Sequence, residues 1–117
     1  MIKNQTFGQA IIAMKQGKIV SREGWNGKDM FIFMQVPSEV PTEIIPKMTS
    51  LPQAVKDKVV KRQLPLRYQN QFAIVYPDNN VYGWSASPSD YSVDDWCIHD
   101  NEYIIAGETV GTAIPIK

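Results

Sequence analysis

The sequence predicts an α+β protein in which an N-terminal helix packs on small antiparallel β-sheets, with a helical insertion in the middle of the chain. Three observations favour this class. One early segment has the apolar spacing of a helix, several short segments alternate polar and apolar residues between turns, and a proline-rich, basic stretch interrupts them at about 38–69. The chain has 117 residues, the length of one domain, so we expect a single binding domain over 1–117.

The first predicted element is a helix that begins after Thr6. Thr6 and Gln9 fit a capping box, in which each side chain accepts a hydrogen bond from the backbone of the other residue. The apolar face that follows consists of Phe7, Ala10, Ile11 and Met14. Gly17 is a typical residue at a helix end, so we expect the helix to stop there.

A β-hairpin is predicted next. Residues 18–22 alternate polar and apolar side chains, as a half-buried strand does, and we expect the return strand over 30–36. Between them lies the pair Asn26-Gly27, which is a strong hairpin-turn signal.

The insertion has a different composition. Prolines at 37, 41, 46 and 52 predict irregular structure over 37–52. We expect a second helix that opens with Ser50 as N-cap, Pro52 in the first turn and Gln53 closing the capping box. Leu64-Pro65 would end this helix.

The rest of the chain returns to short strands. We expect them over 71–76, 81–85, 96–98 and 103–106. Ser87 and Pro88 predict a short helical turn, with Ser87 as the N-cap. The tail after 106 carries only weak signals.

Net charge is zero, but it is unevenly distributed along the chain. Residues 1–37 and 38–76 each carry a net charge of +3, whereas residues 77–117 carry −6. This distribution argues against binding of long nucleic acids, which needs a dominant basic face. It predicts charge pairing between the two halves, within one subunit or across an interface; the alternative is a local basic patch for a small anionic ligand.

Few residues are suited to catalysis or metal binding. The sequence has one cysteine, Cys97, and one histidine, His99, without metal-ligand spacing around them, so we expect no metal site and no cofactor. These two residues share a strand face, but nothing in the sequence orients the imidazole for nucleophilic catalysis. We expect the adjacent Asp94 and Asp95 to form a turn or a cap rather than paired catalytic carboxylates. The sequence therefore favours a binding protein over an enzyme.

No segment predicts export or membrane insertion. No stretch approaches the roughly 20 apolar residues that span a bilayer, and the N-terminus has no apolar signal-peptide region. A single cysteine excludes an internal disulfide, so we expect a reducing cytosol.

The tryptophans are the clearest candidates for binding. Trp25 lies in the predicted hairpin turn, where we expect little core for it to contact, and we interpret it as a stacking plate for a base, a sugar or a partner subunit. Trp84, at a strand end, and Trp96, at the start of a strand, have partial burial in the core as the alternative.

Three sequence blocks occur together in a familiar order. They are Thr6-Phe7-Gly8-Gln9-Ala10 through Gly17-Lys18, then Arg22-Glu23-Gly24-Trp25-Asn26-Gly27-Lys28 with Met30-Phe31-Ile32, and last Gly83-Trp84-Ser85-Ala86-Ser87-Pro88-Ser89-Asp90 ending in Asp94-Asp95-Trp96. Over about 1–36 and 70–98 the chain resembles the phage Thoeris anti-defence two family. The insertion at 38–69 is longer than we expect for the shortest members, and the tail after about 100 is additional.

The resemblance implies a function that composition does not show. Family members act as sponges: they bind, without cleaving, the cyclic ADP-ribose signals of bacterial TIR-domain proteins, such as glycocyclic ADP-ribose, and so silence Thoeris immunity. It also implies a homotetramer with the ligand between subunits, in the cytoplasm of the infected bacterial host. The ligand-binding residues expected on this basis are Arg22, Trp25, Asn26, Gly27, Lys28, Trp84, Ser85, Ser87 and Asp90.

These residue types suit the parts of such a ligand. A tryptophan stacks on adenine, the carboxylate of Asp90 accepts from ribose hydroxyls, and Arg22 and Lys28 suit the pyrophosphate. The alternatives are structural: Arg22 pairs with an acidic residue, Asn26-Gly27 only forms the turn, and Ser87 only caps.

Other interpretations stay open. The basic residues of the insertion form either a solvated helix face or a second anion site for a cyclic oligonucleotide signal; they are Lys56, Lys58, Lys61, Arg62 and Arg67. Alternatively, the protein is a phage structural or protein-interaction module in which Trp25 and Trp84 anchor an interface. A carbohydrate-binding module would use the same two rings as sugar platforms.

Overall fold

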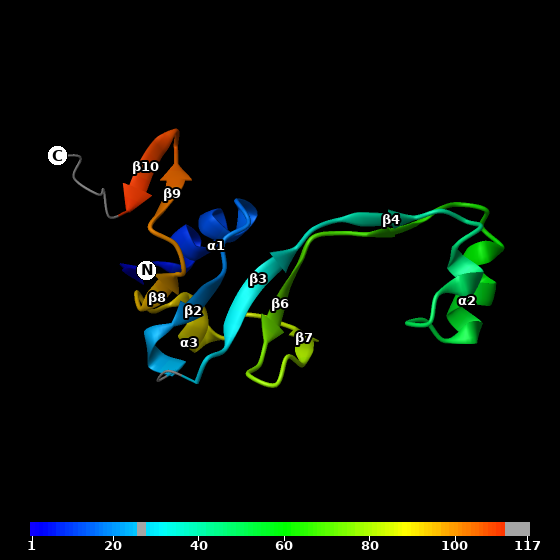
Figure 1. The fold of residues 1–117 in the computed structure, drawn as a ribbon, viewed down its shortest axis with the longest axis horizontal. Coiled ribbons are helices and arrows are strands. Elements are labelled where there is room, and N and C mark those ends of the chain that lie inside the picture. The colour runs from blue at the N-terminus through cyan, green and yellow to red at the C-terminus, as the bar shows by residue number, and fades with distance from the viewer. Residues whose placement is uncertain (26–27, 112–117) are drawn as a thin grey trace. The chain divides into compact units, whose positions relative to one another are not determined.

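A computed structural model describes residues 1–25 and 28–111 and divides the chain into two compact units (Figure 1). The first unit comprises Met1–Gln35 and Gln71–Lys117, and the second comprises Val36–Asn70. The described residues contain three α-helices and ten strands, and all strand pairs are antiparallel, which confirms the α+β class. None of the helices described is long and apolar enough to cross a membrane.

The first unit is built on a six-stranded sheet with the order β1-β8-β2-β3-β6-β7. Its strands are β1 (Ile2–Gln5), β2 (Val20–Arg22), β3 (Phe31–Gln35), β6 (Gln71–Val75), β7 (Val81–Gly83) and β8 (Trp96–Ile98). The sheet therefore joins strands from both ends of the sequence, since β8 lies between β1 and β2. The segments predicted at 18–22, 30–36, 71–76, 81–85 and 96–98 each contain one of these strands, whereas β1 has no counterpart among the predictions.

Helix α1 (Phe7–Lys15) contributes the central side chains of the core. Its capping box is present as predicted: the Thr6 hydroxyl accepts from the Gln9 backbone at 3.1 Å, and the Gln9 side chain accepts from the Thr6 backbone at 2.7 Å. Ala10, Ala13 and Met14 are buried in one cluster with residues of β2, β3 and β8. Burial of a side chain the size of Met14 stabilises a fold by about 1.5–3 kcal/mol.

Five aromatic rings form one end of this core. Trp96 is fully buried, and the rings of Phe7, Trp25 and Trp84 lie 5.2, 5.8 and 5.9 Å from it, centroid to centroid. Phe72 contacts Phe7 and Trp84 edge-on. Trp25 thus contacts the core through Trp96, which corrects the expectation that a tryptophan in this turn has little core to contact.

A C-terminal hairpin of β9 (Glu102–Ile105) and β10 (Glu108–Gly111) completes the first unit. Its Tyr103 is buried and donates a hydrogen bond to Gln5 at 2.7 Å, and the Ile104 N–H donates to the Gln16 side chain at 2.8 Å. Strand β10 was not predicted.

The second unit contains a two-stranded sheet of β4 (Ser38–Val40) and β5 (Leu66–Tyr68), the 3-10 turn η2 (Ile45–Lys47) and helix α2 (Gln53–Val60). The prediction of irregular structure over 37–52 is wrong where β4 and η2 form. The predicted cap is also wrong: Pro52 is the N-cap, and no side chain caps the helix. The helix ends at Val60, before Leu64; a turn over 61–63 follows, in which Gln63 has a left-handed backbone with φ 55°.

Candidate functional site

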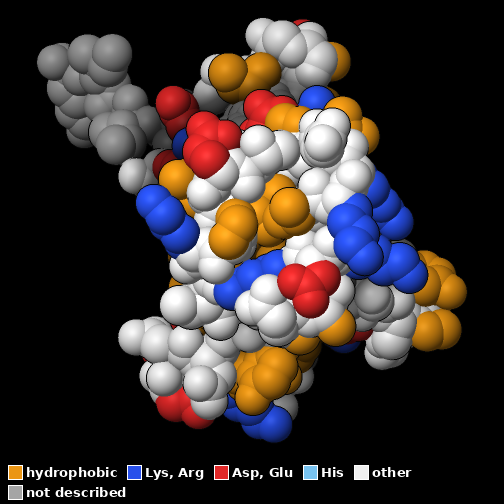
Figure 2. Space-filling model, turned by 90° about the vertical axis from the view of Figure 1, so that its right-hand side faces the viewer, with side chains coloured by type: hydrophobic (Ala, Val, Ile, Leu, Met, Phe, Trp, Pro, Cys, Tyr) orange, Lys and Arg blue, Asp and Glu red, His pale blue; other side chains and the backbone are white. Residues whose placement is uncertain are grey.

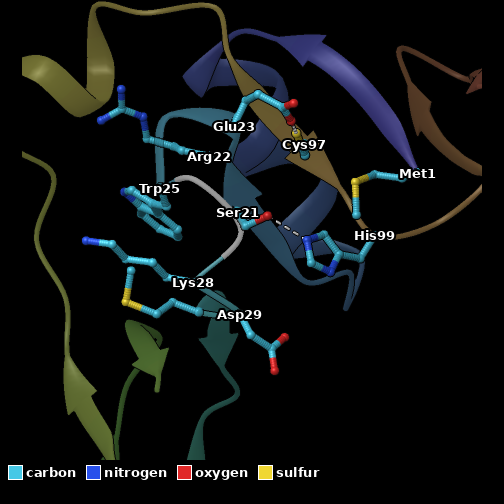
Figure 3. Close-up of a pocket in the computed structure, with 10 residues that line it drawn as sticks. Met1, Ser21, Arg22, Glu23, Trp25, Lys28, Asp29, Cys97 and His99 are labelled. Carbon is cyan, nitrogen blue, oxygen red and sulfur yellow. Dashed lines mark hydrogen bonds between the residues drawn. The ribbon is translucent and has the colours of Figure 1, made fainter. Parts of the chain in front are cut away.

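A pocket of about 660 Å³ lies in the first unit, beside the turn that follows β2 (Figure 3). Its walls come from the end of β2, the 3-10 turn η1 (Glu23–Trp25), the segment that enters β3, and β8 with the residue after it. The lining residues are Met1, Ser21, Arg22, Glu23, Trp25, Lys28, Asp29, Met30, Cys97 and His99. This volume falls in the range of pockets that hold small organic ligands.

Strand pairing explains which side chains reach the pocket. In the β2–β8 ladder, Val20 pairs with Ile98 and both are buried in the core. The next pair, Ser21 and Cys97, faces the other side of the sheet because side chains alternate along a strand. His99 follows two residues after Cys97 and continues the ladder, its backbone N–H donating to Ile19 at 3.0 Å.

His99 and Ser21 form a hydrogen-bonded pair at the pocket wall. The imidazole Nε2 lies 2.6 Å from Ser21 Oγ, as the dashed line in Figure 3 shows. Burial lowers the pKa of His99 below its usual 6.5, and the N-terminal ammonium acts in the same direction, while Asp29 opposes them. The imidazole is therefore neutral at neutral pH.

Cys97 and Glu23 lie at another part of the wall. Cys97 Sγ is 3.5 Å from Glu23 Oε2, and burial, followed by this carboxylate, raises the pKa of the thiol. The side chain therefore remains a thiol at neutral pH, which makes it a poor nucleophile.

Arg22 reaches the opposite face of the sheet from Ser21, and Figure 3 shows its guanidinium pointing away from the Ser21–His99 pair. It donates to Asp90 at 2.8 Å and to Asp95 at 3.0 and 3.3 Å. The hydrogen bond from Arg22 lowers the pKa of Asp95. Burial opposes ionisation of Asp90, but hydrogen bonds from Ser87 and Arg22 outweigh it, so the pKa of Asp90 is lowered as well.

This cluster confirms charge pairing between the two halves of the sequence within one subunit. Arg22 pairs with Asp90 and Asp95, and Lys18 pairs with Asp100 at 2.6 Å. Asp95 also accepts from the Gly24 N–H at 3.0 Å, and a Cβ at Gly24 would lie only 2.9 Å from the same carboxylate. A side chain at position 24 would therefore force the Asp95 carboxylate to shift.

The ligand-binding residues predicted from the sequence fall into three groups. Arg22, Trp25 and Lys28 line the pocket. Asn26 and Gly27 lie outside the described residues. The remainder, Trp84, Ser85, Ser87 and Asp90, are not among the lining residues.

Three of that last group have structural partners. Trp84 belongs to the aromatic cluster. Ser87 is the N-cap residue of helix α3 (Pro88–Tyr91), and it donates to Asp90 Oδ2 through its backbone N–H and its hydroxyl, each at 2.8 Å. Asp90 reaches the pocket only indirectly, through Arg22.

Sequence reasoning missed Ser21, Asp29 and the binding potential of His99. The sequence did contain a signal for His99, because its position two residues after Cys97 places both side chains on the same strand face. Ser21 becomes its neighbour only through the β2–β8 register. Asp29 has a left-handed backbone with φ 57°, a conformation that aspartate tolerates better than most residues.

The basic residues of the insertion do not converge on one site. Lys56 and Lys61 line a separate pocket of about 430 Å³ on α2, together with Asp57. Arg67 pairs with Glu39 at 3.0 Å on the β4–β5 hairpin. Lys58 and Arg62 are exposed and line neither pocket. Figure 2 shows Lys and Arg side chains in separate groups, with acidic, apolar and uncharged surface between them.

Within residues 1–25 and 28–111, no three His, Cys, Asp or Glu side chains are placed to hold a metal ion. The pocket lining offers an aromatic ring, a lysine, two carboxylates and a hydroxyl–imidazole pair.

Comparison with known proteins identifies the family. The family model described as Thoeris anti-defense 2-like domain matches residues 5–99, which include both strands of the pocket wall and the Arg22–Asp90–Asp95 cluster. The chain is also 29% identical over 98 residues to "Thoeris anti-defense 2" of Bacillus phage SP01, an alignment that covers 84% of this chain and 98% of the relative. The chain therefore belongs to the Thoeris anti-defense 2-like family.

Proposed function

We propose that the protein is a phage sponge that sequesters cyclic ADP-ribose-type immune signals, glycocyclic ADP-ribose among them, without cleaving them. It would act in the cytoplasm of the infected bacterium and block Thoeris immunity. One observation carries the proposal: a pocket of about 660 Å³ combines an aromatic ring, a lysine and several polar side chains. Family membership supports the anti-defence role.

Each part of the ligand has a matching group in the pocket. Trp25 is held edge-on against Trp96, so its ring is fixed before an adenine stacks on it. Stacking of a base on an aromatic side chain contributes about 1–3 kcal/mol. Lys28 is exposed at the pocket and suits the pyrophosphate, and the carboxylate of Asp29 suits a ribose hydroxyl.

The polar groups suit binding better than turnover. Ser21 and His99 have the separation of a nucleophile and its base. Such a pair also needs a group that orients the imidazole, and in the described part of the chain no side chain bonds its second nitrogen. Cys97 is held as a thiol. We therefore propose that bound ligand is stored intact.

A second subunit would complete the site. A sponge must bind near nanomolar, which needs about −12 kcal/mol. A ligand of roughly 35 non-hydrogen atoms reaches about −10 kcal/mol at the usual efficiency of about −0.3 kcal/mol per atom, so most of its surface must be buried. We propose a homo-oligomer, a tetramer in keeping with the family, in which a neighbouring copy covers the ligand.

Capture and release tests the function. The protein is mixed with cyclic ADP-ribose isomers, freed of unbound ligand and heat-denatured, and the supernatant is analysed by chromatography. Intact ligand that appears only after denaturation supports the sponge. An altered product would make the protein an enzyme. No capture would favour the alternative, an interaction module anchored by Trp25 and Trp84.

The α2 surface is a second candidate, for cyclic oligonucleotides. Its support is narrow: Lys56 and Lys61 share one pocket, while Arg67 is already paired with Glu39. In the test, Lys61 and Arg62 are replaced together by glutamine. Loss of cyclic di- or trinucleotide binding with unchanged cyclic ADP-ribose binding would support a separate site. Equal loss of both ligands, or no oligonucleotide binding by the parent, would reject it.

A further inference from the structure

His99 has one ring nitrogen engaged and the other directed to the pocket. Nε2 bonds Ser21, while Figure 3 shows the second nitrogen turned away from Ser21, on the side of Asp29. Among the described residues, no buried side-chain nitrogen or oxygen lacks a hydrogen-bond partner. Since no protein group bonds Nδ1 in that part of the chain, this nitrogen lies at the pocket surface, where a ligand can reach it.

The charges around His99 come from several elements. Lys28, Arg22 and the Met1 ammonium are the cations among the lining residues, and Glu23 and Asp29 are the anions. Arg22 is already paired with Asp90 and Asp95. Next to His99 in the sequence, Asp100 is neutralised by Lys18. Burial and the ammonium outweigh Asp29, so the empty pocket favours the neutral imidazole. A phosphate placed in the pocket would add negative charge and reverse this preference.

We propose that His99, oriented by Ser21, binds a phosphate of the nucleotide signal as an imidazolium, so that ligand binding takes up a proton from solvent. This inference rests on the proposed function, because it concerns the same pocket. In the imidazolium both ring nitrogens donate: one to the phosphate, the other to Ser21 Oγ, whose hydroxyl can accept from the ring as well as donate to it. Ser21 therefore suits either form of the ring.

The proposal predicts that affinity rises as pH falls. The pyrophosphate of cyclic ADP-ribose stays ionised throughout the neutral and mildly acidic range, so this group adds no titration there. If the complex raises the pKa of His99 by about one unit, affinity increases about tenfold in total as the pH falls from well above the complex's pKa to well below that of the free protein.

Calorimetric titration of the protein with cyclic ADP-ribose from about pH 8 to about pH 5.5 tests this, with His99→Gln as the matched variant. The glutamine amide can still bond Ser21 but cannot ionise. We expect about tenfold tighter binding at low pH for the parent and no such increase for His99→Gln. Ser21→Ala should bind more weakly at every pH while keeping the increase.

A nuclear magnetic resonance titration gives an independent readout. His99 is the only histidine in the sequence, so its imidazole signals need no further assignment. Its pKa should rise by about one unit when ligand is bound. Binding without pH dependence, or an equal dependence in His99→Gln, would overturn this inference alone. No binding by the parent at any pH would overturn the proposed function together with it.

Discussion

Asp95 holds Arg22 and the start of the next turn with one carboxylate. Its Oδ1 accepts from Arg22 Nε at 3.0 Å, and its Oδ2 accepts from Arg22 Nη2 at 3.3 Å and from the Gly24 N–H at 3.0 Å. The Asp95 backbone carbonyl also accepts from the Glu23 N–H at 2.9 Å. A residue beside β8 thereby fixes the turn η1 that carries Trp25 into the pocket.

Replacement of Asp95 by asparagine should therefore weaken both the fold and the site. The amide loses the charge-assisted bonds to Arg22, and hydrogen bonds to charged groups contribute about 1.5–3 kcal/mol. We expect a loss of this size in the free energy of urea unfolding and a weaker affinity for cyclic ADP-ribose. The neighbouring Asp94 is exposed, so Asp94→Asn is the matched control and should change neither.

The cluster of Arg22, Asp90 and Asp95 predicts that the folded protein loses stability in acid. The pKa values of Asp90 and Asp95 are lowered in the folded state from 3.8. Their contribution to stability is thus present above the unfolded value and is lost as the pH falls through the lower folded values. Unfolding free energies measured from about pH 6 to about pH 2.5 should decline below about pH 4.5. The decline should be smaller in Asp95→Asn; an equal decline would contradict this assignment.

The two candidate stacking tryptophans should behave differently. Trp25→Ala should lower the affinity for cyclic ADP-ribose about ten- to hundredfold, because it removes a stacking surface from the pocket. Trp84→Ala should mainly lower stability, by up to about 3 kcal/mol, because it leaves a gap among the aromatic rings. Calorimetric and unfolding measurements on both variants separate the effects. A larger affinity loss for Trp84→Ala would show that the sequence-based assignment of Trp84 to the ligand was right.

Lys28 should supply a salt-dependent part of the affinity. Lys28→Gln keeps a polar side chain of similar length but removes the charge, so we expect about tenfold weaker binding and a smaller dependence on salt. Lys15→Gln, at the exposed end of α1, is the control and should leave binding unchanged. If the two variants bind alike, Lys28 does not contact the anion.

Ser87 should act as a helix cap rather than as a ligand contact. Ser87→Ala removes the hydroxyl bond to Asp90 and should cost about 0.5–2 kcal/mol of stability, with affinity maintained. Ser50→Ala is the natural comparison, because Ser50 was predicted to cap α2 but no side chain caps that helix. The free energy of unfolding of Ser50→Ala should equal that of the parent protein. A loss of affinity without a loss of stability in Ser87→Ala would support the ligand contact instead.

The sequence predicted the parts of the fold that depend on local chemistry. The capping box at Thr6 and the N-cap at Ser87 formed because their partners lie three residues away, where the backbone geometry is fixed by the helix itself. The cap at Ser50 failed even though its pattern is similar. There the helix begins after Pro52, whose fixed φ already suits a helix start, and the chain gains no side-chain cap.

The features that depend on register could not be predicted in the same way. The Arg22–Asp95 and Ser21–His99 contacts join residues that are 73 and 78 positions apart. Charge asymmetry indicated that the two ends of the sequence pair, but it did not say which residues meet. Strand β1 lies at a sheet edge and β10 in a separate hairpin, and neither has the clear alternation that marks a half-buried strand.

A crystal structure of the protein with cyclic ADP-ribose tests the central claim most directly. We expect the ligand in the pocket of the first unit, with its adenine on Trp25 and a phosphate within hydrogen-bond distance of Lys28 and His99. A neighbouring copy should cover its open side. Ligand bound elsewhere, for example on α2, with this pocket empty would contradict the account.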